Sequence, residues 1–392
     1  TLKVDGIRSN SASSDAITLA SNGTCTANIT NTLGHKNIII NGDCRISQRG
    51  TSSASSGYQT VDRFKHSGSG WDSALTQAQG DVASGTTPYT QGFRKTFKLT
   101  NGNQSSGAGT NDSLSMSYVI EDQDLATSGW NYLSSTSYVT LSFWFKSSVN
   151  QTFYVILESK DGTSRQYSFA ITPTGADTWT KVTHTIPGNS GLQFSNDNGE
   201  GIEIYFALFY GTNLSTSDHT LNTWKTTSST NQIPDMTSTW FTTNNATFEI
   251  TGVQLEVGSV ATDFEHKSYA QELALCQRYY YLHASGQNQV IGVGVLYQGS
   301  NMFTMVKLPV TMRTAPTIDS TTGSNYYQAY NDGSNDGFTA FSGSWNVSPT
   351  QVAMNTHSGD GFSLGSGGEC CMVKTHSDSG ASSAHLGFSA EL

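Results

Sequence analysis

Short stretches in which apolar and polar residues alternate recur along the middle of this sequence. In each of them every second side chain is apolar, which is the period of a half-buried β-strand. Residues that favour turns separate the stretches, and no helical pattern intervenes. The expected strands are 92–99, 114–120, 138–146, 152–158, 166–171, 180–186, 202–210 and 247–257. Eight or more strands joined by turns predict a two-sheet sandwich of the jelly-roll type.

The composition supports an all-β fold. Charged residues make up 13% of the 392 residues, about half the usual share of roughly 25%. Ala, Glu, Lys and Leu are too scarce for long helices, whereas Gly, Ser, Thr and Asn are abundant. Seven prolines and 11% aromatic residues argue against a disordered chain of low complexity.

Charge and motif content exclude several classes of function. The net charge of −10 predicts neither nucleic-acid nor anionic-membrane binding, because both need a basic patch. Membrane insertion and a signal peptide are not expected, since no long apolar run and no basic leader are found. The five cysteines form no CxxC pair, so neither a disulfide framework nor a zinc site is indicated. We expect no metal, no cofactor and no catalytic site, because no hydrolase motif occurs and the carboxylates are scattered.

The pattern changes from strand to helix at Ser268. This residue and Gln271 form a capping box, and the apolar residues beyond it follow the spacing of a coiled-coil seam. We therefore predict a linking helix within 266–283. Such a short helix needs a partner, and two partners stay open: the helix packs on its own domain, or on symmetry copies around an axis. The seam residues are Tyr269, Leu273, Cys276 and Tyr280.

Large side chains also occupy the strand face that points away from the predicted core. In strand 138–146, for example, Leu141, Phe143 and Phe145 would face the core and Trp144 the opposite side. An apolar patch on that side indicates a subunit interface or a glycan-binding groove, and covering loops are the third explanation. With two tryptophans from the long loop 211–245, the candidates are Trp144, Tyr154, Tyr205, Phe209, Trp224 and Trp240.

Three charged residues near the linking helix are candidates for structural ion pairs. Arg278 lies in CQRYYY, Glu256 in QLE and Glu265 in FEH. Pairs among them would lock the helix to the sandwich, and removal of one partner of a buried pair costs roughly 3–5 kcal/mol.

Several segments resemble those of bacteriophage tail-fibre and virion-appendage proteins. VQLEVGSVATDFEHKSYAQELALCQRYYY resembles the segment that closes a lectin-like β domain in such proteins, and NIIINGDCRISQRG followed by YQTVDRF resembles its opening. LPVTMRTAPTI and LGFSAEL resemble the distal domain of these fibres. TLKVDGIRS is similar to the N-terminal attachment segment of cyanophage-like tail fibres.

The resemblance implies a homotrimeric tail fibre that is made in the host cytoplasm and assembled into the virion. Residues 1–36 would attach to other virion proteins, 37–265 would form the jelly roll, and 266–283 a helix on the symmetry axis. Residues 284–392 would then form a small β domain at the tip. Its expected partner is a host-surface glycan or protein. A purely structural capsid decoration or tail adaptor is the alternative, and a glycan depolymerase comes third.

Overall fold

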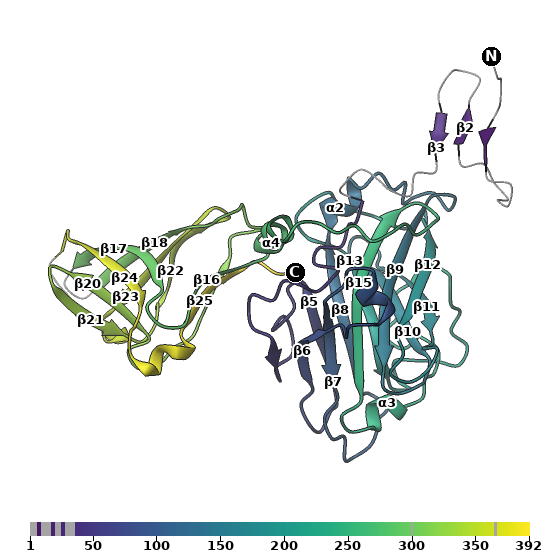
Figure 1. Ribbon diagram of the computed structural model, residues 1–392, viewed down its shortest axis with the longest axis horizontal. Helices are drawn as coiled ribbons and strands as arrows, with labels where there is room; N and C mark the ends of the chain where they lie inside the picture. The colour runs from purple at the N-terminus through teal and green to yellow at the C-terminus, as the bar shows by residue number, and fades with distance from the viewer. Residues whose placement is uncertain (1–5, 9–16, 20–24, 28–35, 299–300, 364–366) are drawn as a thin grey trace.

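The computed structural model describes residues 6–8, 17–19, 25–27, 36–298, 301–363 and 367–392, so most of the predicted attachment segment lies outside the described residues. The chain is elongated: a β-sandwich lies at one end and a second β-region at the other, with a short helix between them (Figure 1). Beside the sandwich, β1 (Gly6–Ile7), β2 (Ile17–Leu19) and β3 (Cys25–Ala27) form a small antiparallel sheet. No helix among the described residues is long and apolar enough to cross a membrane.

Two six-stranded sheets form the sandwich, which confirms the predicted all-β jelly-roll architecture. The first sheet has the order β14 (Lys225–Thr226), β11 (Arg165–Ile171), β10 (Phe153–Ser159), β13 (Glu200–Tyr210), β8 (Ser113–Glu121), β5 (Phe64–Ser69). The second has the order β12 (Thr180–Pro187), β9 (Tyr138–Ser147), β15 (Thr247–Val257), β7 (Lys95–Thr100), β6 (Thr76–Asp81), β4 (Ser52–Ser53). Single helical turns lie between strands: α1 (Thr87–Thr90), α2 (Asp122–Ala126) and α3 (Thr239–Thr242).

The core of the sandwich lies between the inner faces of these sheets. Leu141, Phe143 and Phe145 of β9 are buried in it, as their alternation predicts. Phe143 meets Phe206 of the opposite sheet edge to face, with ring centroids 5.1 Å apart, a preferred geometry for aromatic pairs.

Helix α4 (Tyr269–Gln277) begins at the predicted capping box, in which the Ser268 side chain and Gln271 satisfy each other's backbone N–H groups. The helix is shorter than the predicted segment, because β16 already starts at Tyr280. Cys276 is fully buried and, with Leu273, packs on Ile40 of the same chain. Cys276 and Tyr280 are buried within their own chain, so the expectation of a seam that faces symmetry copies is wrong for these two, whereas Leu273 is half-buried. Tyr269 alone of the four is exposed.

The C-terminal region contains two further sheets and a core of its own. Three strands, in the order β16 (Tyr280–Ser285), β25 (His385–Ser389), β19 (Thr317–Ser320), form the sheet nearer the helix. A curled sheet follows with the order β21 (Ser334–Phe338), β20 (Tyr327–Asn331), β24 (Cys370–Thr375), β17 (Val290–Gln298), β18 (Asn301–Lys307), β23 (Gln351–His357), β22 (Gly343–Ser348). The 3-10 turn η1 (Ser358–Asp360) lies between β23 and β24, and η2 (Ser379–Ser383) lies between β24 and β25.

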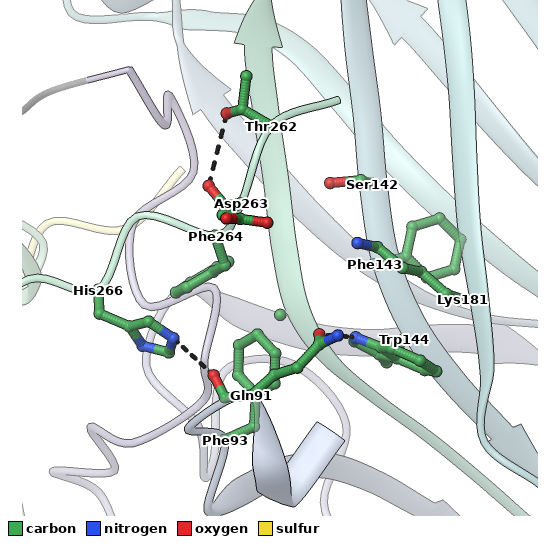
Figure 2. Close-up of a pocket in the computed structure, with 11 residues that line it drawn as sticks. Gln91, Phe93, Ser142, Phe143, Trp144, Lys181, Thr262, Asp263, Phe264 and His266 are labelled. Atoms are coloured by element: carbon green, nitrogen blue, oxygen red, sulfur yellow. Dashed lines mark hydrogen bonds between the residues drawn. The ribbon is translucent and has the colours of Figure 1, made fainter. Parts of the chain in front are cut away.

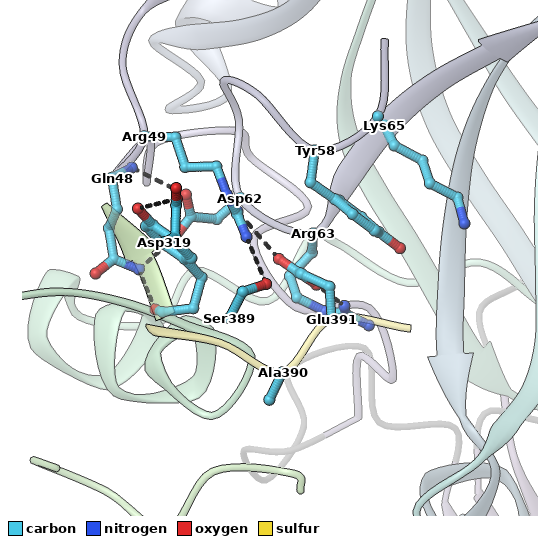
Figure 3. Close-up of polar contacts among 12 residues, drawn as sticks. Gln48, Arg49, Tyr58, Asp62, Arg63, Lys65, Asp319, Ser389, Ala390 and Glu391 are labelled. Atoms are coloured by element: carbon cyan, nitrogen blue, oxygen red, sulfur yellow. Dashed lines mark hydrogen bonds and ion pairs between the residues drawn. The ribbon is translucent and has the colours of Figure 1, made fainter. Parts of the chain in front are cut away.

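The last residues of the chain return to the sandwich and pair with it (Figure 3). The Tyr58 hydroxyl donates to the backbone oxygen of Leu392 at 2.9 Å, and Arg49 forms an ion pair of 3.2 Å with Glu391. Arg49 also stacks on the Tyr280 ring, with its guanidinium carbon 3.6 Å from the centroid. The two regions are thus joined by buried and half-buried polar contacts as well as by α4.

Candidate functional site

A pocket of about 280 Å³ lies on the outer face of the second sheet, over β9 and β15 (Figure 2). Strand pairing places Lys181 of β12 directly beside Trp144 of β9. The turn after α1 contributes Gln91 and Phe93, and the segment that follows β15 contributes Thr262, Asp263, Phe264 and His266. Segments distant in the sequence therefore meet above one face of the sheet.

A glycine shapes the floor of this pocket. The pairing of β15 with β9 is irregular between Thr251 and Gln254, and Gly252 in this bulge has a φ of +65°. A Cβ atom at this position would lie 2.6 Å from the Phe93 ring. Only glycine adopts this conformation at little cost and also leaves room for the ring, so Phe93 lies directly against the sheet.

Two polar side chains at the end of β15 hold the wall formed by residues 262–266. The Glu256 carboxylate accepts from the Thr262 backbone N–H at 2.8 Å and from the Thr262 hydroxyl at 2.7 Å. The Gln254 side-chain oxygen accepts from the Glu265 N–H at 2.9 Å. Both side chains are buried, so these hydrogen bonds fold the segment back over its own strand.

Aromatic rings make up much of the pocket lining. Phe264 meets Phe93 at 5.0 Å and His266 at 4.9 Å, both edge to face. Across the pocket, the Trp144 indole N–H donates to the Gln91 side-chain oxygen at 3.1 Å, which fixes the plane of the indole. His266 Nε2 donates to the Gln91 carbonyl at 2.9 Å and closes the ring of contacts.

Polar groups at the rim are available to a ligand. Lys181 and Asp263 are exposed, and neither the ammonium nor the carboxylate has a hydrogen-bond partner among the described residues. Ser142 lies between them; it is buried, and its hydroxyl also has no hydrogen-bond partner among the described residues. Aromatic faces surrounded by a few polar groups are typical of small-molecule sites. Such a pocket can hold a ring beside Phe264 and the part of Trp144 that remains exposed, and hydrogen-bond its hydroxyl groups.

The predicted surface aromatics are dispersed over the molecule, and only Trp144 lies in the pocket. Tyr154 is buried on the outer face of the first sheet, where it packs with Ile233 of the long loop and Tyr210. Tyr205 is half buried on that face, and its hydroxyl donates to Glu203 at 2.5 Å and accepts from Lys160 at 2.9 Å. Loops of the same chain cover this face, which is the third explanation considered for it.

Three other candidates belong to the main core, so their prediction as surface residues is wrong. A register shift in β13 between Ala207 and Phe209 turns Phe209 inward, where it stacks on Phe241 at 4.7 Å. Trp224 comes from a loop and Trp240 from the single turn α3, and both side chains fold inward. Each satisfies its indole N–H with a backbone oxygen, that of Pro187 at 2.7 Å and that of Thr247 at 3.0 Å.

The three predicted ion-pair residues have other partners than one another. Arg278 does tie the helix to the sandwich, but it pairs with Glu121 at the end of β8, at 2.5 and 2.9 Å. Glu265 accepts from the Asn37 N–H at 2.8 Å and lies 3.6 Å from Lys267. The hydrogen bonds of Glu256 lie within the pocket wall. The short helix places Arg278 beyond its last turn, where Glu121 is within reach and the other two carboxylates are not.

Sequence reasoning missed most of the pocket. Phe93 and Gln91 belong to an insertion with several aromatic residues, and Asp263 and Phe264 reach the pocket only because Glu256 folds the chain back. The usable signal is Gly252 within an otherwise alternating strand, because an isolated glycine in a strand marks a bulge or a close approach of another segment.

Comparison with known proteins identifies similar folds but no family. The sequence matches no protein family and no curated protein. Among solved structures, the enzymatically active domain of tailspike protein 4 of bacteriophage CBA120 is similar over 57% of this chain and 21% of its own, with 12% identity and a TM-score of 0.30. This chain thus spans about a fifth of that protein's length.

Two carbohydrate-binding domains are similar as well. The family 11 carbohydrate-binding module of cellulase Lic26A-Cel5E of Clostridium thermocellum matches with 14% identity over 55% of this chain and 98% of its own, with a TM-score of 0.26. The N-terminal cellulose-binding domain of Cellulomonas fimi β-1,4-glucanase C matches with 10% identity over 55% of this chain and 99% of its own, with a TM-score of 0.25.

Proposed function

We propose that this chain is a bacteriophage tail fibre, or a related virion appendage, that binds a host-surface carbohydrate in the pocket beside Trp144. The observation that carries the carbohydrate part is the pocket itself, in which aromatic rings stand next to unpartnered polar groups. A pyranose presents apolar C–H faces and equatorial hydroxyls, and both kinds of surface find a counterpart here. The sequence resemblance supports the phage setting.

The dimensions and charges of the pocket favour one sugar residue of a neutral or zwitterionic glycan. Its volume of about 280 Å³ lies just below the range for ligand pockets, which begins at about 300 Å³. Asp263 and Lys181 offer one charge of each sign, so neither a polyanionic nor a polycationic ligand is favoured. Affinity for one sugar residue would be low, and several copies on one particle would raise it through effective concentration.

Binding without cleavage is the proposed activity. Hydrolysis of a glycoside usually needs two carboxyl groups roughly 5–9.5 Å apart. Asp263 is the one carboxylate among the described residues that line the pocket. The homotrimer and the attachment through residues 1–36 are part of the same proposal and rest on the sequence resemblance.

Binding of host-derived oligosaccharides to immobilised protein tests the proposal. Asp263→Asn and Lys181→Met remove one exposed rim group each, and each should weaken binding about 10-fold or more, because hydrogen bonds to charged groups contribute about 1.5–3 kcal/mol. Asp177→Asn is the control: Asp177 is exposed, lies outside the pocket, and has a positive φ that asparagine tolerates.

Unchanged binding by both rim variants would exclude this pocket. If no host glycan binds the wild type at all, the purely structural alternative gains. Release of reducing ends from host polysaccharide would instead support the depolymerase.

A further inference from the structure

A recess of about 660 Å³ lies on one face of the curled sheet in the C-terminal region. It extends over four neighbouring strands, β17, β18, β23 and β22. In β18, Met302 and Val306 belong to the C-terminal core, whereas Phe303 and Met305, which alternate with them, line the recess. The recess therefore lies on the face that points away from the core.

One side of the recess is apolar and aromatic. Val295 of β17 is the direct cross-strand neighbour of Phe303. Tyr297 follows on the same face of β17, and its ring meets that of Phe303 edge to face, with centroids 5.6 Å apart. Tyr297 is 62% exposed and Met305 is 64% exposed. A ligand in the recess therefore meets an accessible tyrosine ring beside a methionine side chain.

The other side of the recess carries amide groups. Strand pairing places Asn355 of β23 directly beside Phe303, and Asn301 of β18 beside His357. Asn346 adds a third amide from β22, the strand at the edge of the sheet. None of the three amide groups has a hydrogen-bond partner in the part of the chain that the structure describes. Each can both donate to a ligand and accept from it.

The recess offers hydrogen bonds but no fixed charge. Among the described residues, no Asp, Glu, Lys or Arg lines it. His357 Nδ1 accepts from the Gly359 N–H at 2.9 Å, so the neutral ring keeps its proton on Nε2 as a further donor. A charged ligand would lose its hydration here without gaining a partner of opposite sign. A neutral ligand with many hydroxyl groups is therefore favoured.

We propose that this recess is a second carbohydrate site and that it takes a neutral disaccharide. The apolar C–H face of a sugar ring matches the side formed by Tyr297 and Met305, and the hydroxyl groups at its rim match the amides. The volume lies within the range of about 300–1,000 Å³ for ligand pockets. It is also more than twice the volume of about 280 Å³ beside Trp144, so two sugar residues fit where that pocket takes one.

This site goes beyond the proposed function, which places a glycan only in the pocket beside Trp144. The two sites share no residue, and they lie in different regions of the elongated chain (Figure 1). They also differ in charge, since Lys181 and Asp263 lie at the rim of the first site. Each site can therefore be removed without the other.

Binding of neutral di- and trisaccharides to the whole chain tests the second site, first on an array and then by calorimetry with the disaccharide that binds most tightly. Tyr297→Ala removes the exposed ring without opening the core, and it should weaken binding about 10-fold. Tyr269→Ala is the matched control, because Tyr269 is 59% exposed and lies on α4. It should leave the affinity unchanged.

Asn355→Leu separates a sugar from an apolar partner. The substitution keeps the size of the side chain but removes the amide, so a saccharide should bind about 5-fold more weakly or worse. An apolar peptide or protein surface would bind this variant at least as tightly as the wild type.

Methionine oxidation locates the ligand without any substitution. Met305 lines the recess, whereas Met372 of β24 is 43% exposed and lies outside it. A saturating concentration of the disaccharide should slow the oxidation of Met305 by peroxide about 5-fold or more and leave that of Met372 unchanged.

The variants distinguish failure of this site from failure of the first pocket. Loss of disaccharide binding in Tyr297→Ala but not in Asp263→Asn supports the second site, whatever the first pocket binds. Loss in Asp263→Asn with full binding by Tyr297→Ala would overturn it and leave the first pocket as the carbohydrate site. A wild type that binds none of the neutral saccharides, tighter binding by Asn355→Leu, or equal oxidation of Met305 with and without disaccharide would overturn it as well.

Discussion

Arg63, in the turn before β5, and Glu391, the next-to-last residue, form an ion pair of 2.5 Å in which the side chains are 1% and 7% exposed. The guanidinium also donates to the Val119 carbonyl at 2.5 Å and lies 3.5 Å from the centre of the Tyr279 ring. A carboxylate from the end of the chain therefore neutralises a cation that the sandwich buries completely. This contact makes the stability of the sandwich depend on the C-terminal region.

Removal of this carboxylate should be costly. Glu391→Ala leaves Arg63 as a buried charge without its partner, and we expect a loss of about 3–5 kcal/mol in the free energy of unfolding. Urea unfolding measured by tryptophan fluorescence would detect it. The control is Asp81→Ala, which breaks an ion pair of similar length, 2.6 Å to Lys95, on the open surface. That change should cost less than about 1 kcal/mol, and equal losses in the two variants would contradict the burial argument.

The fold was largely predictable, because burial of one strand face imposes alternation. Leu141, Phe143 and Phe145 illustrate this, since all three lie in the core as expected. Alternation fails where the backbone departs from a regular strand. Phe209 follows a register shift. The rule that every second residue of the strand faces the core therefore no longer predicts the side on which Phe209 lies. Trp240 lies in α3, a single helical turn that is too short for a period to indicate whether a side chain turns inward.

The site was less predictable, because its residues meet only through tertiary contacts. Trp144 was found because it lies in a strand with a readable period. Asp263 and Phe264 reach the pocket only because Glu256 holds the chain in a tight return, and hydrogen bonds between side chain and backbone leave no periodic trace. In the same way, Arg278 was recognised as a structural residue, whereas its partner Glu121 is more than a hundred residues away in sequence.

The pair of Arg278 and Glu121 can be tested by removing first one partner and then both. The Glu121 side chain is fully buried and also accepts from the Tyr279 hydroxyl at 2.6 Å. Although burial raises the pKa of Glu121, the hydrogen bonds from Arg278 and Tyr279 hold it below the usual value. Arg278→Leu should lower the free energy of unfolding by about 3–5 kcal/mol, because it leaves the buried Glu121 carboxylate without its partner.

Addition of Glu121→Gln to Arg278→Leu should recover a large part of this loss, since the side chain left behind is then neutral. Thermal unfolding of the wild type, the single variants and the double variant forms a complete cycle. If the double variant is as unstable as the sum of the two single variants, the residues are not coupled.

Acid should destabilise the sandwich through His66. Burial lowers the pKa of His66 to about 4, whereas an unfolded histidine has a pKa of about 6.5. Between pH 4 and pH 6.5, His66 binds a proton in the unfolded state but stays neutral in the folded state. Stability from this residue is therefore complete above pH 6.5 and is lost as the pH falls toward 4, by about 3 kcal/mol in total.

A non-titrating replacement isolates this contribution from that of other groups. His66 Nδ1 lies 3.0 Å from the side-chain nitrogen of Gln77, and His66→Gln retains an acceptor for that contact. The difference in unfolding free energy between wild type and variant should shrink by about 3 kcal/mol between pH 7 and pH 4. A difference that stays constant over this range would show that His66 does not titrate with folding.

Gly252 links the stability of the sandwich to the shape of the pocket. Gly252→Ala places a methyl group in the space of the Phe93 ring, at 2.6 Å, and in a conformation with φ near +65° that alanine adopts only at a cost. The conformational part costs about 1 kcal/mol and overpacking adds about 1–3 kcal/mol. Gly258→Ala is the control, because φ is +129° there but nothing lies within 4 Å of the added Cβ atom. It should show the backbone strain without the clash.

The same two variants test whether the floor of the pocket contacts the ligand. Displacement of Phe93 should weaken oligosaccharide binding in Gly252→Ala, whereas binding should stay intact in Gly258→Ala, where Phe93 is not displaced. Equal binding by the two variants would mean that the floor of the pocket does not contact the ligand.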